Sequence, residues 1–288
     1  MKDTYTRYSG CINTLDNVTV YMTKGTLGAL VCPILEDELL YNIRNDDDID
    51  EIVLIENEHI KSVRPKMDHQ EIQYRMCSEE DFLNGKVLLP NDYNLVIWMM
   101  DMGLHAEPEE LKDHLHDSCK RIQGRVDAIT LYYGLCGNGL KNIEEWGKEN
   151  LSVPVTIMKD QEGRICDDCI AVAVGGCAQY LKLLRKYPGI MYFTPAYATN
   201  WDEMKYRMDI FRGFTLEDGT DMTKMLFEMA GYKYVMEIPT GLGDAKLAHK
   251  EAKKFAKEMG LKVIQLEKDW CSLEPTKLIH ENSKSLLE

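Results

Sequence analysis

Short apolar stretches alternate with longer amphipathic segments along most of this chain. The apolar stretches are rich in β-branched and aromatic residues, which is typical of buried strands. The predicted strands are residues 29–32, 51–56, 93–99, 128–133, 153–158, 190–194, 234–238 and 262–266. The predicted helices are residues 36–44, 108–122, 170–186 and 246–259. This alternation predicts an α/β fold, a mostly parallel sheet with helices on both of its faces.

The length of 288 residues is enough for one large α/β domain or for two lobes. Residues 27–275 form the predicted α/β domain, and two lobes would divide near 145–165 or 195–230. Residues 1–26 do not fit the alternation, so we expect an N-terminal extension or an added hairpin there. Residues 276–288 are predicted to be a C-terminal tail.

The chain is acidic, because 34 Lys and Arg stand against 48 Asp and Glu and give a net charge of −14 at pH 7. Such a surface repels phosphate backbones and anionic lipids, so we expect neither nucleic acid nor a membrane as a partner. The N-terminal region has no secretory signal pattern, and no apolar stretch approaches the roughly 20 residues of a membrane span. We therefore expect a soluble, cytoplasmic protein that acts on a small-molecule substrate.

Nine cysteines are many for a chain without an export signal. Their number is odd, which argues against a disulfide framework. Free cysteine is also a common small core residue, so we expect two to four of them to take part in chemistry and the others to pack. Sixteen methionines beside these cysteines would be an oxidation liability in air, which favours a reducing or anoxic habitat.

Three cysteines stand where a parallel sheet binds its ligands, just beyond the carboxyl ends of strands. Cys32 ends the first predicted strand, Cys136 lies in the glycine-rich loop after residues 128–133, and Cys169 opens the helix that begins at Ile170. Free backbone N–H groups at such places favour the thiolate, which is both the metal ligand and the nucleophile. Each cysteine taken alone could equally be a packed core residue.

Two further residues, His105 and Asp168, are the candidate catalytic residues of the same site. His105 follows the strand of residues 93–99 and could be a fourth ligand, a general acid or a structural histidine. Asp168 could be a helix cap, a ligand or an acceptor behind a ligand, and capping is the default for this position. Cys166 and Cys169 form a C-x-x-C motif, which on its own is weak evidence for thiol–disulfide exchange.

Two glycine-rich turns could bind a cofactor with their backbone N–H groups. Gly134, Gly137 and Gly139 follow one strand, and Gly241 and Gly243 follow another. Neither turn has the spacing of a dinucleotide-binding or Walker motif, so plain turn geometry is the alternative.

Five ordered groups of motifs resemble a known family. They are Val31-Cys32 with Glu36-Asp37-Glu38-Leu39, Met102-Gly103-Leu104-His105 with Pro108-Glu109-Glu110-Leu111, Tyr133-Gly134-Leu135-Cys136-Gly137-Asn138-Gly139-Leu140, Asp168-Cys169-Ile170 with Pro188-Gly189, and Thr240-Gly241-Leu242-Gly243-Asp244. In this order they resemble the family called domain of unknown function 1638 (DUF1638), from about residue 27 to residue 275.

The resemblance implies a setting rather than a reaction. The family occurs in methanogens and other anaerobes, often encoded beside corrinoid-dependent methyltransferase systems. It thereby implies one-carbon metabolism, with a corrinoid protein or a methyltransferase as a partner, and gives importance to Cys32, His105, Cys136, Asp168 and Cys169. One departure stands out, since Asp167-Asp168-Cys169 replaces His-Asp-Cys, so Asp167 or Cys166 could substitute for a histidine.

Three functions follow from these patterns. The first is a metal-dependent transferase whose zinc is held by Cys32, Cys136 and Cys169, with the fourth position open or filled by His105. The second replaces zinc with a [4Fe–4S] cluster that has one iron free for substrate, as in a lyase, a reductase or a reductive activator. The third is a non-enzymatic partner or chaperone of a corrinoid protein.

Overall fold

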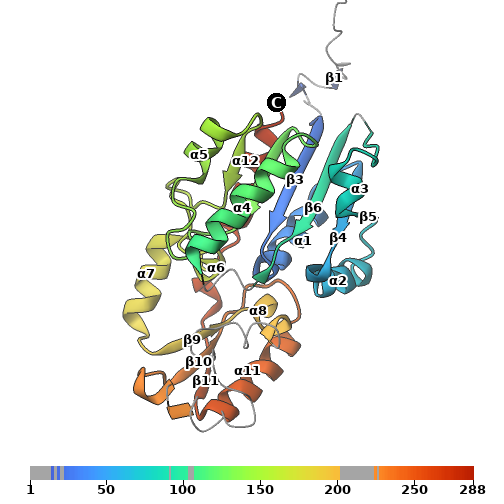
Figure 1. Cartoon of the computed structure of the whole chain (residues 1–288). Helices are drawn as coiled ribbons and strands as arrows, with labels where there is room; N and C mark the ends of the chain where they lie inside the picture. The colour runs from blue at the N-terminus through green and yellow to red at the C-terminus, as the bar shows by residue number, and fades with distance from the viewer. Residues whose placement is uncertain are drawn as a thin grey trace, which may run out of the picture.

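The computed structural model describes residues 23–90, 92–102, 107–201, 224–225 and 227–288, together with the backbone of residues 14–15 and 18–19. Two parallel sheets dominate the molecule (Figure 1). The six-stranded sheet has the order β5 (Arg75–Ser78), β4 (Glu51–Glu56), β6 (Tyr93–Met99), β3 (Gly25–Val31), β7 (Ala128–Tyr132), β8 (Val155–Ile157). The three-stranded sheet has the order β11 (Lys262–Gln265), β10 (Tyr234–Glu237), β9 (Ile190–Phe193). The predicted α/β class with a mostly parallel sheet is confirmed.

Helices cover both faces of the six-stranded sheet, as the near-continuous apolar strands predict. On one face Leu30, with Val96 and Ile129 of the adjacent strands, packs under α3 (Glu79–Leu83), α4 (Pro108–Ile122) and α5 (Ile143–Asn150). On the other face Ala29 and Val31 pack under α1 (Glu36–Arg44), α2 (Val63–His69) and α12 (Glu274–Ser285). Leu30 thus points to one face of the sheet, and Ala29 and Val31 point to the other, as the two-residue repeat of a β-strand requires.

The chain reverses its direction of winding between β3 and β6, which are adjacent in the sheet. From β3 it runs through α1 to β4 on one side, and from β6 it runs through α4 to β7 on the other side. Right-handed crossovers that move in opposite directions place their helices on opposite faces, as observed for α1 and α4. Ligands of open α/β sheets bind at such a switch point, at the carboxyl ends of the strands.

The three-stranded sheet lies beyond these carboxyl ends, toward which the arrowheads of β3 and β6 point in Figure 1. Its inner face carries an aromatic group formed by Phe193, Tyr197, Trp201 and Phe255, with ring centroids 4.6 to 5.9 Å apart. Tyr197 belongs to α8 (Pro195–Thr199) and Phe255 to α11 (Ala245–Met259). The same apolar cluster also contains Leu30 of the six-stranded sheet, so the core is continuous between the two sheets.

The predicted helix over residues 170–186 is wrong as a single element. It is two helices, α6 (Cys169–Ala173) and α7 (Cys177–Lys186). Gly175 and Gly176 adopt positive φ angles of 87° and 123°, which a continuing helix does not allow, and the backbone at Val174 bridges to Ser272. The apolar periodicity continues through this turn and predicts one helix, although the Gly175-Gly176 pair is itself a turn signal.

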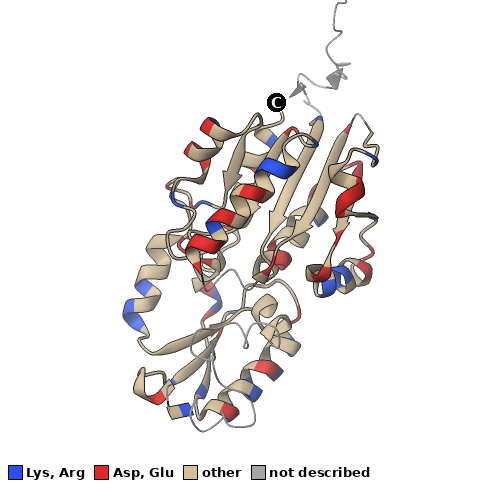
Figure 2. Ribbon diagram, in the orientation of Figure 1, with Lys and Arg blue, Asp and Glu red and all other residues tan. Residues whose placement is uncertain are grey.

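Both ends of the chain differ in detail from the pattern. β3 begins at Gly25, and β1 (Thr14–Leu15) pairs antiparallel with β2 (Val18–Thr19), while the other residues before position 23 lie outside the described residues. Residues 276–288 contain most of helix α12, whose Ile279 is fully buried against the six-stranded sheet. Acidic and basic residues are interspersed over the helices, as Figure 2 shows.

Candidate functional site

Cys32 lies directly after β3, at the switch point of the six-stranded sheet. Its backbone N–H donates to the carbonyl of Tyr132 at the end of β7, 3.3 Å away. This bond fixes the ends of the two strands side by side. The side chains of Cys32, Tyr133 and Cys136 are buried in one cluster as a result.

The loop after β7 is bound to the segment that precedes α6. Leu135 N–H donates to the Cys166 carbonyl at 2.8 Å, and Cys136 N–H donates to the Asp167 carbonyl at 3.1 Å. A Cβ atom at Gly134 would lie 2.6 Å from the Cys166 carbonyl oxygen, so the close approach requires glycine there. Cys136 itself has a φ of 44°, in the left-handed region that costs a residue with a side chain about 1 kcal/mol. Strained backbone conformations of this kind cluster at functional sites.

Cys169 is the first residue of α6, and it contacts all three apolar clusters of the protein. Asp168 is the N-cap of this helix, since one carboxylate oxygen accepts hydrogen bonds from the N–H groups of Ile170 and Ala171. The other oxygen accepts from the Tyr180 hydroxyl at 2.7 Å. The default capping prediction for Asp168 is therefore confirmed, and both of its oxygens have protein partners.

The three thiols lie close enough to affect one another's charge. Burial raises the pKa of Cys32, and the neighbouring Cys136 raises it further. Burial raises the pKa of Cys169 most, and the neighbouring Asp168, Cys32 and Cys136 raise it further. The pKa of Cys136 rises to about 12, mainly through burial. All three are therefore neutral thiols near pH 7 unless a cation joins them.

The thiols are not arranged as a coordination shell. Within the ranges that the structure describes, no group of three or more His, Cys, Asp or Glu side chains has the spacing to hold a metal ion. The proposed fourth ligand, His105, lies outside the described residues. Three converging thiols nevertheless supply the soft donors that zinc and iron–sulfur clusters take.

A buried acidic cluster lies beside the thiols, at the start of α1. Glu36, Asp37 and Glu38 are each at most 5% exposed. Lys66 of α2 binds two of them, with its Nζ 2.7 Å from Glu36 and 2.6 Å from Asp37. Asn200 at the end of α8 donates to Glu36 Oε1 at 3.2 Å and to the Pro33 carbonyl at 3.3 Å. The cluster thus connects the two sheets.

Glu36 and Glu38 both lie near enough to Cys32 to affect its charge, and Glu38 also affects Cys169. The charge of Glu38 would raise the pKa values of both Cys32 and Cys169. Burial, assisted by Asp37, raises the pKa of Glu38 to about 8, and its Oε2 has no hydrogen-bond partner among the described residues. The Tyr133 hydroxyl is likewise buried and unpaired within the described part of the chain. The neutral Glu38 carboxyl is a proton donor near Cys32 and Cys169.

The sequence pattern did not identify this cluster, although Glu36, Asp37 and Glu38 belong to one of the motifs that resemble the family. Three consecutive acids are usually a solvated face, so only their position after the strand that ends at Cys32 could have identified them.

The two cysteines of the C-x-x-C motif have different surroundings. Cys32 and Cys136 are the thiols that raise the pKa of Cys169. The thiol that raises the pKa of Cys166 is Cys177. The described cysteines, Cys166 and Cys169 among them, are free thiols. Cys119 on α4 is fully buried among apolar residues, and burial alone raises its pKa to about 12. It is an ordinary core cysteine.

The two glycine-rich turns also differ. Gly137 and Gly139 lie against Pro108, where Cβ atoms would come within 2.6 Å of it, and together with Gly134 they fit the loop into its neighbours. Gly241 and Gly243 instead line a cleft of about 1270 Å³ between α1, α2 and the loop after β10. A cofactor-binding role for any of these glycines stays a prediction.

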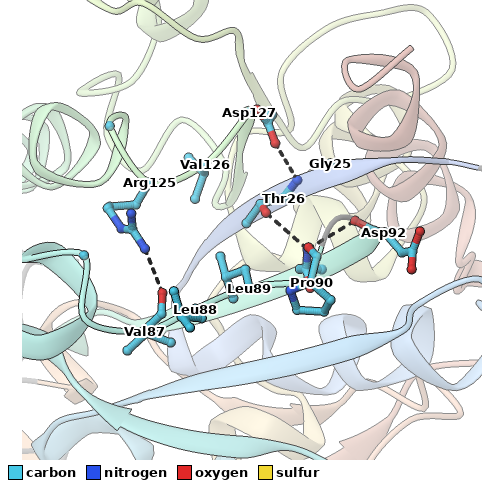
Figure 3. A pocket seen from close by; sticks show the side chains of 13 residues that line it. Gly25, Thr26, Val87, Leu88, Leu89, Pro90, Asp92, Arg125, Val126 and Asp127 are labelled. Carbon is cyan, nitrogen blue, oxygen red and sulfur yellow. Dashed lines mark hydrogen bonds between the residues drawn. The ribbon is translucent and has the colours of Figure 1, made fainter. Parts of the chain in front are cut away.

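A second hollow, of about 450 Å³, lies at the opposite, amino end of β3, β6 and β7 (Figure 3). Its polar groups bind one another, since Arg125 donates to the Val87 carbonyl and Asp127 accepts from the Thr26 N–H. A hollow whose polar groups are already paired, at the amino end of the strands, is a poor candidate for a ligand site.

Residues 99–276 match the sequence model of a family described as "Protein of unknown function (DUF1638)". The chain belongs to this family. The match covers both the Cys136 and the Cys169 motifs, whereas Cys32 and the acidic cluster precede it. Neither the curated proteins nor the solved structures gave a match. Among the helices of the described residues, none has the length and apolar content that a membrane crossing needs.

Proposed function

We propose that this member of the DUF1638 family is a metal-dependent enzyme in which Cys32, Cys136 and Cys169 hold a soft metal ion, most simply zinc. The observation that carries the proposal is the convergence of three thiols, two buried and one half-buried, from three separate segments at the carboxyl edge of a parallel sheet. Three neutral thiols gain little by lying together. Three thiolates around a cation do gain, because the attraction between opposite charges compensates the cost of burying them.

Metal binding would require these side chains to come together from their present positions. Cysteine has one side-chain torsion, so a change of rotamer moves each sulfur without a change of fold. Three protein ligands with an open position, or with His105 in it, is the arrangement of catalytic zinc sites. Such a zinc ion supplies Lewis acidity and the ability to bind a substrate thiol as the thiolate.

The chain itself would supply a proton beside this centre. Glu38 carries a proton at neutral pH because burial raises its pKa to about 8, and it is adjacent to Cys32 and Cys169. The more specific proposal, methyl transfer in one-carbon metabolism with a corrinoid protein or a methyltransferase as the partner, rests on the family resemblance. A cytoplasmic location belongs to the same proposal.

A [4Fe–4S] cluster is the second candidate. It is favoured by the count of converging ligands, since three cysteines leave one iron of a cluster free for substrate. The two candidates differ in colour. Protein isolated without oxygen would be brown with a cluster and colourless with zinc.

The decisive test is the metal content of protein purified without oxygen, compared between two variants. Cys136→Ser removes a proposed ligand, because the serine hydroxyl stays protonated at neutral pH and is a poor ligand in a thiolate site. Cys119→Ser is the matched control, a substitution at an equally buried cysteine away from the site. We expect about one metal ion or cluster per chain in the wild type and in Cys119→Ser, and loss of it in Cys136→Ser.

Thermal melting of the same proteins completes the test. The fold should survive the loss of metal, since a chain of this size has a large apolar core. Stoichiometric metal in Cys136→Ser would exclude Cys136 as a ligand, and metal-free wild-type protein would exclude the metal site altogether.

A further inference from the structure

We propose that the cleft between α1, α2 and the loop after β10 binds a small organic anion, a phosphate monoester or a carboxylate with an apolar body. This proposal does not require a metal at the thiols. The cleft has a volume of about 1270 Å³, which accommodates an organic molecule rather than an inorganic ion alone. It lies at the carboxyl end of β10 and next to the acidic cluster, where an α/β protein binds its ligands.

Three cations of the lining are available to bind an anion. In a chain with net charge −14, Arg44, Lys246 and Lys268 all line this cleft, and none of them forms an ion pair with a described residue. Among the acids of the lining, Asp37 is neutralised by Lys66 at 2.6 Å, and Asp244 caps α11 through the N–H groups of Lys246 and Leu247. Asp244 keeps its charge while it caps the helix, and Glu71 is exposed, so the cleft presents three cations without ion pairs to described residues beside two acidic side chains.

The backbone of the loop offers further donors. The N–H groups of Gly241, Gly243 and Ala245 donate no hydrogen bond to another described residue. Gly241 and Gly243 have positive φ angles of 81° and 65°, and adjacent N–H groups in such conformations form anion-binding concavities. The N-terminus of the 15-residue helix α11 follows directly and adds a favourable dipole.

An unpaired buried atom at the wall of the cleft points independently to a ligand. Asp37 is 5% exposed, and its Oδ2 has no hydrogen-bond partner among the described residues. Gly243 packs so closely on this oxygen that a Cβ atom would lie 2.3 Å from it. A buried polar atom without a partner costs about 1–3 kcal/mol, and a ligand that carries a donor would remove this cost once the loop at Gly243, which covers the oxygen, moves away from it.

The apolar part of the lining decides the rest of the ligand. Leu40, Tyr41, Leu242 and Leu273 line the cleft beside the charged groups. They provide a surface for an aliphatic or aromatic body. The structure therefore favours an organic acid over free inorganic phosphate.

The test uses three small probes with the full-length protein: 4-aminophenyl phosphate, 4-aminobenzoate and aniline. Their affinities are measured by titration calorimetry at low and at physiological salt. We expect the phosphate or the carboxylate probe, or both, to bind with dissociation constants in the range of about 0.1–1 mM, and aniline to bind at least tenfold more weakly. The two acidic probes distinguish a phosphate-specific site from a general acid site.

Charge-neutralising variants identify the site. Arg44→Gln combined with Lys246→Gln should weaken the acidic probe about tenfold, the loss expected for charge-assisted contacts near the surface. Arg185→Gln combined with Lys253→Gln is the matched control, because it removes the same two residue types from exposed positions on α7 and α11 outside the cleft. Its effect should stay within twofold.

Three results would overturn the proposal. They are no binding of either acidic probe, equal affinity for aniline, or an equal loss in both double variants. Metal content measured on the same samples separates this outcome from that of the thiol site, since the cleft variants should leave it unchanged.

Discussion

Replacing Gly134 with alanine tests how the loop after β7 is held against the segment that precedes α6. A methyl group there would lie 2.6 Å from the Cys166 carbonyl oxygen and 2.9 Å from the Asp168 Cα. Both are backbone atoms, so no flexible side chain can move aside. The φ of Gly134 is outside the positive range, and the strain is therefore steric alone.

The expected magnitude follows from the packing. Overpacking in a well-filled region costs about 1–3 kcal/mol, and separation of the two segments would also weaken the hydrogen bonds at Leu135 and Cys136, each worth about 1 kcal/mol. We expect Gly134→Ala to lower the free energy of unfolding by about 2–4 kcal/mol in urea denaturation. The Cys136 thiol should at the same time react faster with a soluble disulfide reagent.

Gly124→Ala is the control for this experiment. Gly124 is exposed, and a methyl group there would meet nothing within 4 Å. The substitution should be neutral or slightly stabilising, because alanine restricts the unfolded chain. A Gly134→Ala protein as stable as this control, with unchanged thiol reactivity, would refute the argument that close backbone contact positions Cys136.

Two further predictions concern charged groups. Lys66→Met should lower the free energy of unfolding by about 3–5 kcal/mol in urea denaturation, because it leaves the buried Glu36 and Asp37 without their counter-charge. Lys61→Met, on the exposed surface, should change the free energy of unfolding by less than about 0.5 kcal/mol. Equal effects of the two substitutions would refute the structural role of Lys66. Burial would raise the pKa of Asp46, but hydrogen bonds from His280 and Lys284 lower it to about 2. Because the folded pKa is lower than the ordinary value, this stabilisation is complete above about pH 4 and is lost as the pH falls toward 2. The stability difference between wild type and Asp46→Asn should therefore shrink over that interval, and a difference that does not change with pH would contradict the assignment.

The sequence predicted the fold class because it depends on local signals, whereas the site residues that it suggested stay a prediction. Strands 51–56 and 93–99 matched their predicted bounds, since apolar β-branched stretches of this length have few alternatives. Cys32, Cys136 and Cys169 were placed together by the single rule that parallel strands end at one edge. Helix α2 and strand β5 were missed, because residues 63–69 and 75–78 are mostly polar or exposed and carry weak periodicity.

The remaining features arise from contacts between distant segments. The pairing of Lys66 with Glu36 joins residues 30 positions apart, and the bond from Asn200 to Glu36 spans 164 positions. No local pattern reports such a contact. The same holds for the cleft, whose walls come from α1, α2 and the loop after β10. Binary patterning specifies which residues face a core, but it does not specify which polar residues meet across two sheets.

The acidic cluster explains how the thiol site and the cleft can belong to one centre. Asp37 lines the cleft, whereas Glu38 affects the charge of Cys32 and Cys169. Successive residues of a helix point about 100° apart, so neighbours in the first turn of α1 serve two sides of the same wall. Lys66 holds Glu36 and Asp37 in place, and Asn200 connects Glu36 to the element that follows β9. A ligand that alters the position of Asp37 therefore acts on a cluster whose next residue holds a proton beside Cys32 and Cys169.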